Sequence, residues 1–189
     1  MIRLPQNTAL IIIDVQQGFN DPSWGARNNP DAEQRMAALL AAWRDTGRPV
    51  FHIQHLSTSD SSPLNPRNPG CAIKEIVQPL ENEPVVQKHV NSAFIGTSLE
   101  DSLHRRGIAT VAMVGLTTPH CVSTSARMAA NLGFEVYLPG DAIAAFEMAG
   151  PDGRLYSADE IHSVSLATLH GEFATVVDAK TLLDAVHSG

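Results

Sequence analysis

The chain has 189 residues, of which 43% are hydrophobic and 17% are charged, and its formal net charge at pH 7 is −7. This balance excludes a disordered chain and is typical of a folded globular protein. The net negative charge provides no basic surface, so we expect neither nucleic acid nor a membrane as a partner. The length suits a single domain, which we expect to cover residues 1–189.

The sequence also indicates the compartment in which the protein works. Nothing near the N-terminus has the features of a secretory signal, and every apolar run is too short to cross a membrane. Cys71 and Cys121 lie far apart in the sequence, which indicates neither a disulfide framework nor a cluster of metal-binding cysteines. These features predict a cytoplasmic protein with reduced thiols.

Short β-rich runs alternate with helical patterns along the first half of the chain. Residues 8–15, TALIIIDV, form a continuous apolar run that predicts a strand buried on both faces. Residues 31–47 predict a helix, because their apolar side chains recur at helical spacing, and residues 49–56 predict a second strand. Residues 57–70 are rich in Ser, Asn, Pro and Gly and predict a long loop, of the kind that often forms a lid or a substrate wall.

The second half of the chain repeats this alternation. The predicted strands are residues 83–90, 108–116, 134–143 and 174–179, and the predicted helices are residues 98–107, 121–133 and 157–173 and a short C-terminal segment. Alternation of this kind predicts right-handed crossovers and a parallel sheet with helices on both faces. We therefore expect a three-layer α/β/α sandwich around a mostly parallel sheet of about six strands.

Three reactive side chains stand where predicted strands end. Asp14 follows the first apolar run, Lys88 follows the apolar pair in residues 83–90, and Cys121 follows the strand at residues 108–116. In such sheets ligands collect at the carboxyl ends of the strands, so we expect the acid, the amine and the thiol to meet there. Together they are a nucleophile with a base and a cation.

Cys121 has a further physical argument in its favour, because it falls in or just before the first turn of the predicted helix. Unpaired backbone N–H groups and the helix dipole stabilise an anion there, and a nearby ammonium lowers the pKa of a thiol further. The alternative is that Cys121 is a small buried hydrophobic residue, and Asp14 and Lys88 argue against it. Cys71 lies in a loop without such neighbours, and we interpret it as incidental.

Three segments carry a resemblance to a known family. They are ALIIIDVQQGF, VVQKHVNSAF and VGLTTPHCVSTSARMAANLGFEV, in that order, and the similarity extends from Thr8 to Ala179. Together they resemble the isochorismatase-like cysteine hydrolases, a superfamily that includes nicotinamidases, N-carbamoylsarcosine amidases, ureidoacrylate hydrolases, biuret hydrolases and streptothricin hydrolases. The resemblance implies that Asp14, Lys88 and Cys121 are the catalytic set. It also implies a non-proline cis peptide between Leu116 and Thr117, with the N–H groups of Thr117 and Cys121 as an oxyanion hole.

The implied reaction is acyl transfer from a small molecule to a thiol. Asp14 would take the thiol proton, Cys121 would attack an amide, ureide or carbamoyl carbon, and water would hydrolyse the thioester. Three alternatives stay open at this point. They are isochorismatase-type hydrolysis of another small metabolite, a thiol redox or sensor function of Cys121, and a binding module without catalysis.

The region after the second predicted strand departs from the nicotinamidase pattern. Nicotinamidases have a metal site built from an Asp-x-His segment and a further His, whereas this chain reads FHIQHLSTSD, without the acid. His52 and His55 are three residues apart, so on a regular strand they point to opposite faces and do not share one ion. We therefore expect no metal and no cofactor, and we do not expect nicotinamide as the substrate.

Other side chains are predicted to form the pocket walls or an interface. The resemblance implies a homodimer or a homotetramer, in which residues 147–160 lie near a neighbouring subunit. His104, His162 and His170 lie in helical patterns, where core or solvated roles are expected. The predicted substrate-binding residues are Phe19, Trp24, Phe94, His120 and Phe146.

Overall fold

The computed structural model describes residues 2–188 of the chain. The main sheet contains β1 (Ala9–Ile13), β2 (Val50–His55), β3 (Val85–Lys88), β4 (Thr110–Leu116), β5 (Glu135–Pro139), β6 (Ile143–Ala144) and β9 (Thr175–Val177). Six strands follow the order β3–β2–β1–β4–β5–β9, β6 pairs with β4, and all of these pairings are parallel. The expected α/β fold with a mostly parallel sheet is confirmed, and the short strand β6 brings the sheet to seven strands.

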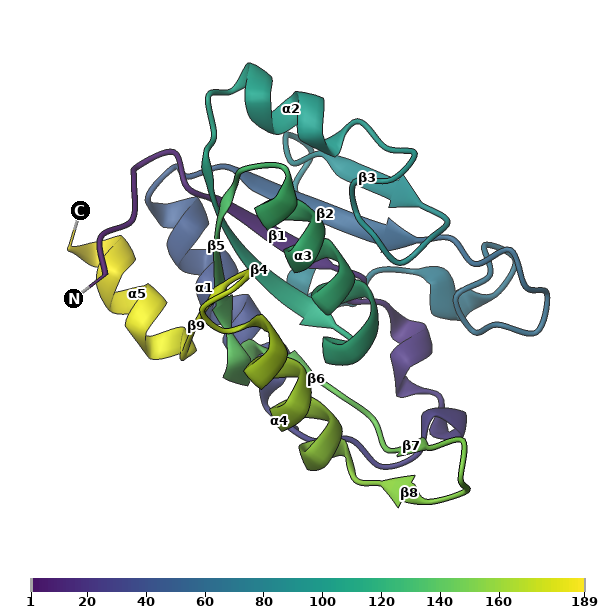
Figure 1. Ribbon diagram of the computed structural model, residues 1–189. Coiled ribbons are helices and arrows are strands. Elements are labelled where there is room, and N and C mark those ends of the chain that lie inside the picture. Colours follow the sequence, from purple (N-terminus) through teal and green to yellow (C-terminus); the bar gives the residue numbers. More distant parts are fainter. Residues whose placement is uncertain (1, 189) are drawn as a thin grey trace.

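Helices cover both faces of this sheet (Figure 1). α1 (Ala32–Asp45) and α5 (Ala179–His187) lie on one face, and α2 (Leu99–Arg105), α3 (Ser123–Asn131) and α4 (Ala158–Leu169) lie on the other. Within residues 2–188, no helix is both long enough and apolar enough to cross a membrane.

The alternation of side chains along β1 divides the core into two layers. Leu10 and Ile12 pack into the cluster that includes α1 and α5, whereas Ile11 and Ile13 pack into the cluster beneath α2, α3 and α4. All four are at most 1% exposed, so both faces of the strand are buried. Each such side chain contributes about 1.5–3 kcal/mol through removal from water, which explains why this strand is a continuous apolar run.

The segment predicted as one strand at residues 134–143 is wrong in its second half. β5 ends at Pro139, a helical turn occupies Gly140–Ala142, and the chain then pairs with β4 as β6. The side-chain amide of Asn29 stabilises the turn by donating to the carbonyls of Gly140 (3.0 Å) and Ile143 (2.7 Å). Further on, β7 (Met148–Ala149) and β8 (Leu155–Tyr156) form an antiparallel hairpin within residues 147–160.

The centre of the sheet is a switch point. The connection after β1 leads to β2 on one side, and the connection after β4 leads to β5 on the other side. The carboxyl ends of β1 and β4 therefore lie where the two connections part, which is the usual place of a ligand site in such sheets. Gly115 of β4 permits the close approach of these two strands, because a Cβ atom there would overlap the backbone carbonyl of Ile13.

Candidate active site

Asp14 lies immediately beyond β1 and is completely buried. Its backbone has a left-handed conformation (φ 54°), which turns the chain away from the strand direction, and its N–H donates to the carbonyl of Ile53 at 3.0 Å. Its Oδ2 atom lies 2.6 Å from Lys88 Nζ, and this ion pair has no exposed side-chain surface. The carboxylate is therefore fixed by the strand that precedes it and by a cation.

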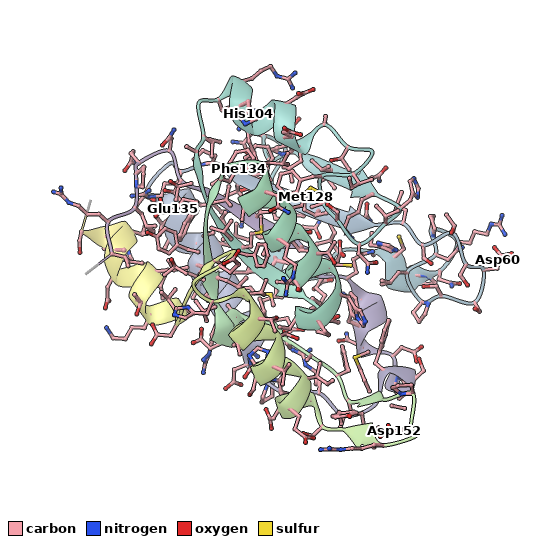
Figure 2. All side chains as sticks on the ribbon, in the orientation of Figure 1. Asp60, His104, Met128, Phe134, Glu135 and Asp152 are labelled. Carbon is pink, nitrogen blue, oxygen red and sulfur yellow. The ribbon has the colours of Figure 1, made fainter. Side chains whose placement is uncertain are left out.

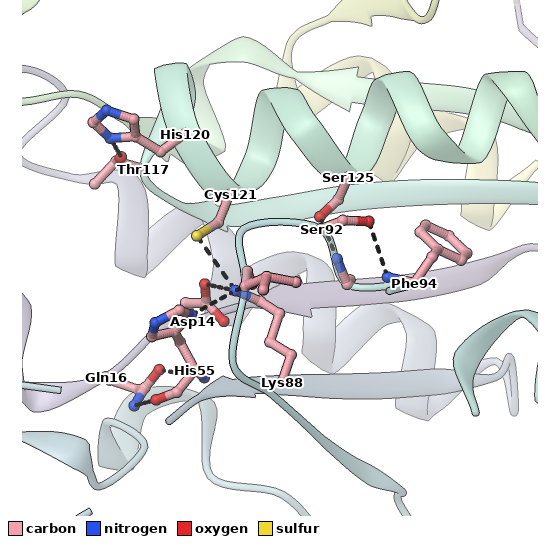
Figure 3. A network of polar contacts seen from close by, with 12 residues as sticks. Asp14, Gln16, His55, Lys88, Ser92, Phe94, Thr117, His120, Cys121 and Ser125 are labelled. Carbon is pink, nitrogen blue, oxygen red and sulfur yellow. Dashed lines mark hydrogen bonds and ion pairs between the residues drawn. The ribbon is translucent and has the colours of Figure 1, made fainter. Parts of the chain in front are cut away.

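Lys88 is the last residue of β3, where exposed and buried residues alternate, and its side chain points inward. Its Nζ atom lies within hydrogen-bond distance of four groups: Asp14 Oδ2 (2.6 Å), the Val90 carbonyl (3.1 Å), His55 Nδ1 (3.1 Å) and Cys121 Sγ (3.3 Å). A buried ammonium is stable only with partners of this kind. Lys88 is the common neighbour of the acid and the thiol (Figure 3).

Cys121 lies in a short π-helix, Thr118–Val122, that joins β4 to α3. This helical turn begins three residues before the predicted helix, so the cysteine lies inside the first turn. The Sγ atom points from the helix toward Lys88 and Asp14 (Figure 3). The strand ends that the sequence pattern assigns to one edge of the sheet therefore bring the acid, the amine and the thiol together.

The protonation of the thiol differs from the sequence-based expectation. Burial and the Asp14 carboxylate raise the pKa of Cys121 to about 12, although Lys88 opposes them. Burial also raises the pKa of Asp14, against the attraction of Lys88. The helix N-terminus and the ammonium do not outweigh burial beside a carboxylate. The resting sulfur is therefore a thiol next to a base.

The backbone beside the sulfur provides an unused donor. The peptide bond between Leu116 and Thr117 is cis, as the resemblance implies. Within residues 2–188, the Thr117 N–H has no hydrogen-bond acceptor. The side chain of Thr117 contacts that of His120, with 3.1 Å between Oγ1 and Nδ1. An N–H group of this kind can bind a developing oxyanion.

A metal ion does not fit this arrangement. Asp14, His55 and Cys121 offer ligand atoms that all lie within 4.8 Å of one another. However, the Lys88 ammonium contacts each of the three groups, so a cation already lies among them. His52 points elsewhere and contacts Glu83 at 2.8 Å, as alternation along the strand predicts.

Three of the five predicted substrate-binding residues form one aromatic cluster. Phe19 lies 5.0 Å from Trp24 and 6.2 Å from Phe146 between ring centroids, and Trp24 lies 5.6 Å from Phe146. The Arg27 guanidinium stands 5.8 Å from the Phe146 ring centroid. We refer to Phe19, Trp24 and Phe146 as the aromatic cluster.

Phe94 does not join the aromatic cluster. Its ring stacks on Phe134 at 6.0 Å in the core beneath α2 and α3, and it points away from the sulfur (Figure 3). His104 stacks on the same Phe134 at 5.1 Å (Figure 2). His162 contacts Thr118 Oγ1 at 3.0 Å, and His170 accepts the Val176 N–H at 3.1 Å.

Sequence reasoning considered His55 only as a metal ligand and did not consider Gln16. His55 is the last residue of β2, so the strand-end rule that found Asp14 and Lys88 also applies to it. Gln16 is completely buried and binds both backbone groups of His55. Nothing in the sequence marks a glutamine as buried.

Comparison with known proteins identifies the family. The Isochorismatase domain model matches residues 8–181. The chain belongs to the isochorismatase family. The isochorismatase-family protein YrdC of Bacillus subtilis, described as uncharacterised, is 50% identical over 96% of this chain and 97% of its own length. An isochorismatase-family protein of known structure from Chromobacterium violaceum is 43% identical, covers 100% of this chain and 98% of its own, and superposes with a TM-score of 0.96.

Another relative of this isochorismatase-family chain has a named reaction. Streptothricin hydrolase of Streptomyces noursei is 34% identical over 76% of this chain and 52% of its own length. The similarity of the chain to this enzyme therefore supports a hydrolase of the family.

Proposed function

We propose that this isochorismatase-family hydrolase cleaves a C–N bond of a small amide, ureide or carbamoyl compound through a Cys121 thioester. One observation carries the proposal. A buried ammonium, Lys88 Nζ, lies within hydrogen-bond distance of both the Asp14 carboxylate and the Cys121 sulfur. This pairs a buried nucleophile with a base, as covalent catalysis requires.

The chemistry begins with a neutral thiol. Asp14 Oδ1 is buried, has no hydrogen-bond partner in the described part of the chain, and is the oxygen available to accept the thiol proton. As Cys121 loses that proton, its sulfur attacks the substrate carbonyl carbon, and Lys88 stabilises the developing negative charge. The high pKa of the thiol favours proton transfer that accompanies attack over a thiolate formed beforehand.

The remaining steps use the same groups. The N–H groups of Thr117 and Cys121 bind the tetrahedral oxyanion. Protonated Asp14 then donates its proton to the leaving nitrogen, the C–N bond breaks, and a thioester remains. Asp14 next takes a proton from water, and the resulting hydroxide attacks the thioester carbon. The C–S bond then breaks, Asp14 returns its proton to the departing sulfur, and the acid product leaves.

Aromatic side chains near the carboxyl edge of the sheet are the candidates for the walls of the substrate site. The aromatic cluster follows β1 and β6, at the carboxyl edge where the catalytic groups lie, and offers flat apolar surface to a substrate. His120 adjoins the nucleophile and is exposed. We propose the aromatic cluster and His120 as the wall, and we assign Phe94 to the core beneath α2 and α3.

An ammonia-release screen over small amides, ureides and carbamoyl compounds tests this function. We expect the wild-type protein to release ammonia from at least one class, Cys121→Ala to lose turnover completely, and Cys71→Ala to retain it. Cys71→Ala is the matched control because Cys71 is the other buried thiol. Full activity of Cys121→Ala would contradict the mechanism. A Cys71–Cys121 disulfide after mild peroxide, without amide turnover, would favour the redox alternative.

A further inference from the structure

We propose that His55 is a fourth functional side chain of this site, a positioning residue that accepts a hydrogen bond from Lys88 and competes with the Cys121 sulfur for it. The role in turnover rests on the proposed function. The placement of His55 is built into the sheet, because the register of β2 and β3 pairs His55 with Lys88 as the last pair of the ladder. Neighbours in register present their side chains on the same face, and Nδ1 lies 3.1 Å from Nζ.

The hydrogen bonds of Lys88 cannot all exist at once. An ammonium has three N–H donors, whereas four acceptors surround Nζ. The carboxylate of Asp14 is charged and lies at 2.6 Å, and the Val90 carbonyl lies at 3.1 Å. The third N–H is then shared between His55 Nδ1 and Cys121 Sγ.

The chemical state of the sulfur decides which of the two receives this N–H. A thiol or a thioester sulfur is a weak acceptor, so the N–H bonds to His55 in those states. A thiolate forms a stronger, charge-assisted bond, so the N–H turns to the sulfur while negative charge develops there. His55 thus keeps the buried ammonium paired before and after attack, without moving Nζ away from Asp14.

The protonation of His55 agrees with this role. Because an ammonium only donates hydrogen bonds, Nδ1 must be the unprotonated nitrogen of the ring. Burial and the charges of Lys88 and the neighbouring His89 lower the pKa of His55 to about 4, against the Val90 carbonyl. Asp14 and Cys121 also lie beside the ring, with ligand atoms within 4.8 Å. The ring is neutral at any pH well above 4 and can accept.

Gln16 fixes the backbone of His55. Its side-chain Nε2 donates to the His55 carbonyl at 3.0 Å, and its Oε1 accepts the His55 N–H at 2.9 Å (Figure 3). The same Nε2 also donates to the carbonyl of Cys71 at 2.8 Å. This bond holds the residue that follows the loop at 57–70 against the end of β2. The segment that carries Asp14 therefore also holds the residue that positions Lys88.

Alkylation of the intact protein by iodoacetamide tests the competition without a substrate. Rates at Cys121 are followed by peptide mass spectrometry across pH for wild type, His55→Leu and His55→Asn. Leu removes the acceptor, so Lys88 donates more to the sulfur and the thiol pKa falls by about one unit. The larger thiolate fraction, offset in part by lower nucleophilicity, raises the rate at fixed pH about threefold. Asn places a carbonyl oxygen where Nδ1 lies and keeps the wild-type rate.

Turnover is expected to fall in the His55→Leu variant, in which alkylation becomes faster. On an amide found by the screen, we expect kcat of His55→Leu to fall about tenfold with KM little changed, and His55→Asn to restore it. If the Leu variant does not fold, His55→Ala provides the same comparison. Equal alkylation rates in all variants, or equal changes for Leu and Asn, would overturn the proposal. If no amide is hydrolysed but the alkylation rates differ as expected, the competition stands and the hydrolase proposal fails.

Discussion

At the scale of single residues, the site depends on a carboxylate held in an unusual environment. Asp14 is completely buried, and its two oxygens have different neighbours: Oδ2 pairs with Lys88, and Oδ1 has no partner among residues 2–188. Burial raises its pKa, which brings the carboxyl group closer to the range in which it can accept a proton and return it. Burial and the negative charge of the Asp14 carboxylate together raise the pKa of Cys121.

Asp14→Asn separates these two effects. Loss of the base is expected to lower turnover by at least about 100-fold. Loss of the negative charge is expected to lower the thiol pKa, because the carboxylate no longer repels the thiolate or competes with it for Lys88. Iodoacetamide alkylation of Cys121 should therefore become faster while amide hydrolysis nearly stops. Turnover close to that of wild type would show that Asp14 is not the base.

At the scale of elements, one buried carboxylate joins α1 to two loops. Glu33 accepts two hydrogen bonds from the Arg27 guanidinium, at 2.9 and 3.0 Å, and one from Lys74 at 2.7 Å. Lys74 also donates to Asn20 Oδ1 at 2.7 Å, at the end of the turn that carries Phe19. The loop that carries Phe19 and Trp24 is therefore held by charge pairs as well as by packing.

Glu33→Gln is expected to destabilise the protein by about 2–3 kcal/mol at pH 7, because it leaves two cations without their carboxylate. Burial favours a higher pKa for Glu33, but the hydrogen bonds from Arg27 and Lys74 outweigh it and lower the pKa to about 2. A lowered pKa stabilises the folded state above the unfolded value of about 4.5, and this stability is lost as the pH falls toward 2. Urea unfolding should show the difference between wild type and variant shrinking from pH 5 to pH 2. A difference that does not change with pH would contradict this account.

At the scale of the whole molecule, the site lies where the chain connections after β1 and β4 leave toward opposite sides of the sheet. The two central strands approach closely at Gly115, which has a φ of 133° and no room for a side chain. Asp14 stands directly after β1, Lys88 ends β3, and Cys121 stands in the helical turn that follows β4. The single domain and the homodimer or homotetramer stay predictions, and sedimentation of the purified protein measures the latter.

Gly115→Ala is expected to cost at least about 3 kcal/mol, because the new Cβ forces β1 and β4 apart and the backbone conformation is unfavourable for alanine. Gly107→Ala is the matched control, since Gly107 also has a positive φ (63°) but a Cβ atom added there would meet nothing within 4 Å. We expect it to cost only about 1 kcal/mol. Equal losses in thermal or urea unfolding would show that backbone conformation, and not strand approach, sets the requirement for glycine.

The local pattern of the sequence was enough to predict most of the architecture. An apolar run such as residues 8–15 forms a strand with both faces buried. The absence of alternating polar residues in the run indicates that burial directly. The positions of Asp14, Lys88 and Cys121 at strand ends followed from the same pattern, since parallel strands share one carboxyl edge. The cis peptide at Leu116 came from the family resemblance.

Other features depend on contacts between segments that are distant in the sequence. The turn at Gly140 depends on Asn29, the grouping of Phe19 with Phe146 depends on two loops that meet, and Phe94 lies in the core because Phe134 faces it. The high pKa of Cys121 and the role of His55 arise from burial and from pairing across strands. The sequence by itself therefore determined that Asp14, Lys88 and Cys121 reach the carboxyl edge of the sheet. Only the tertiary structure decided their protonation and their partners, because desolvation and hydrogen-bond competition depend on the three-dimensional surroundings of each atom.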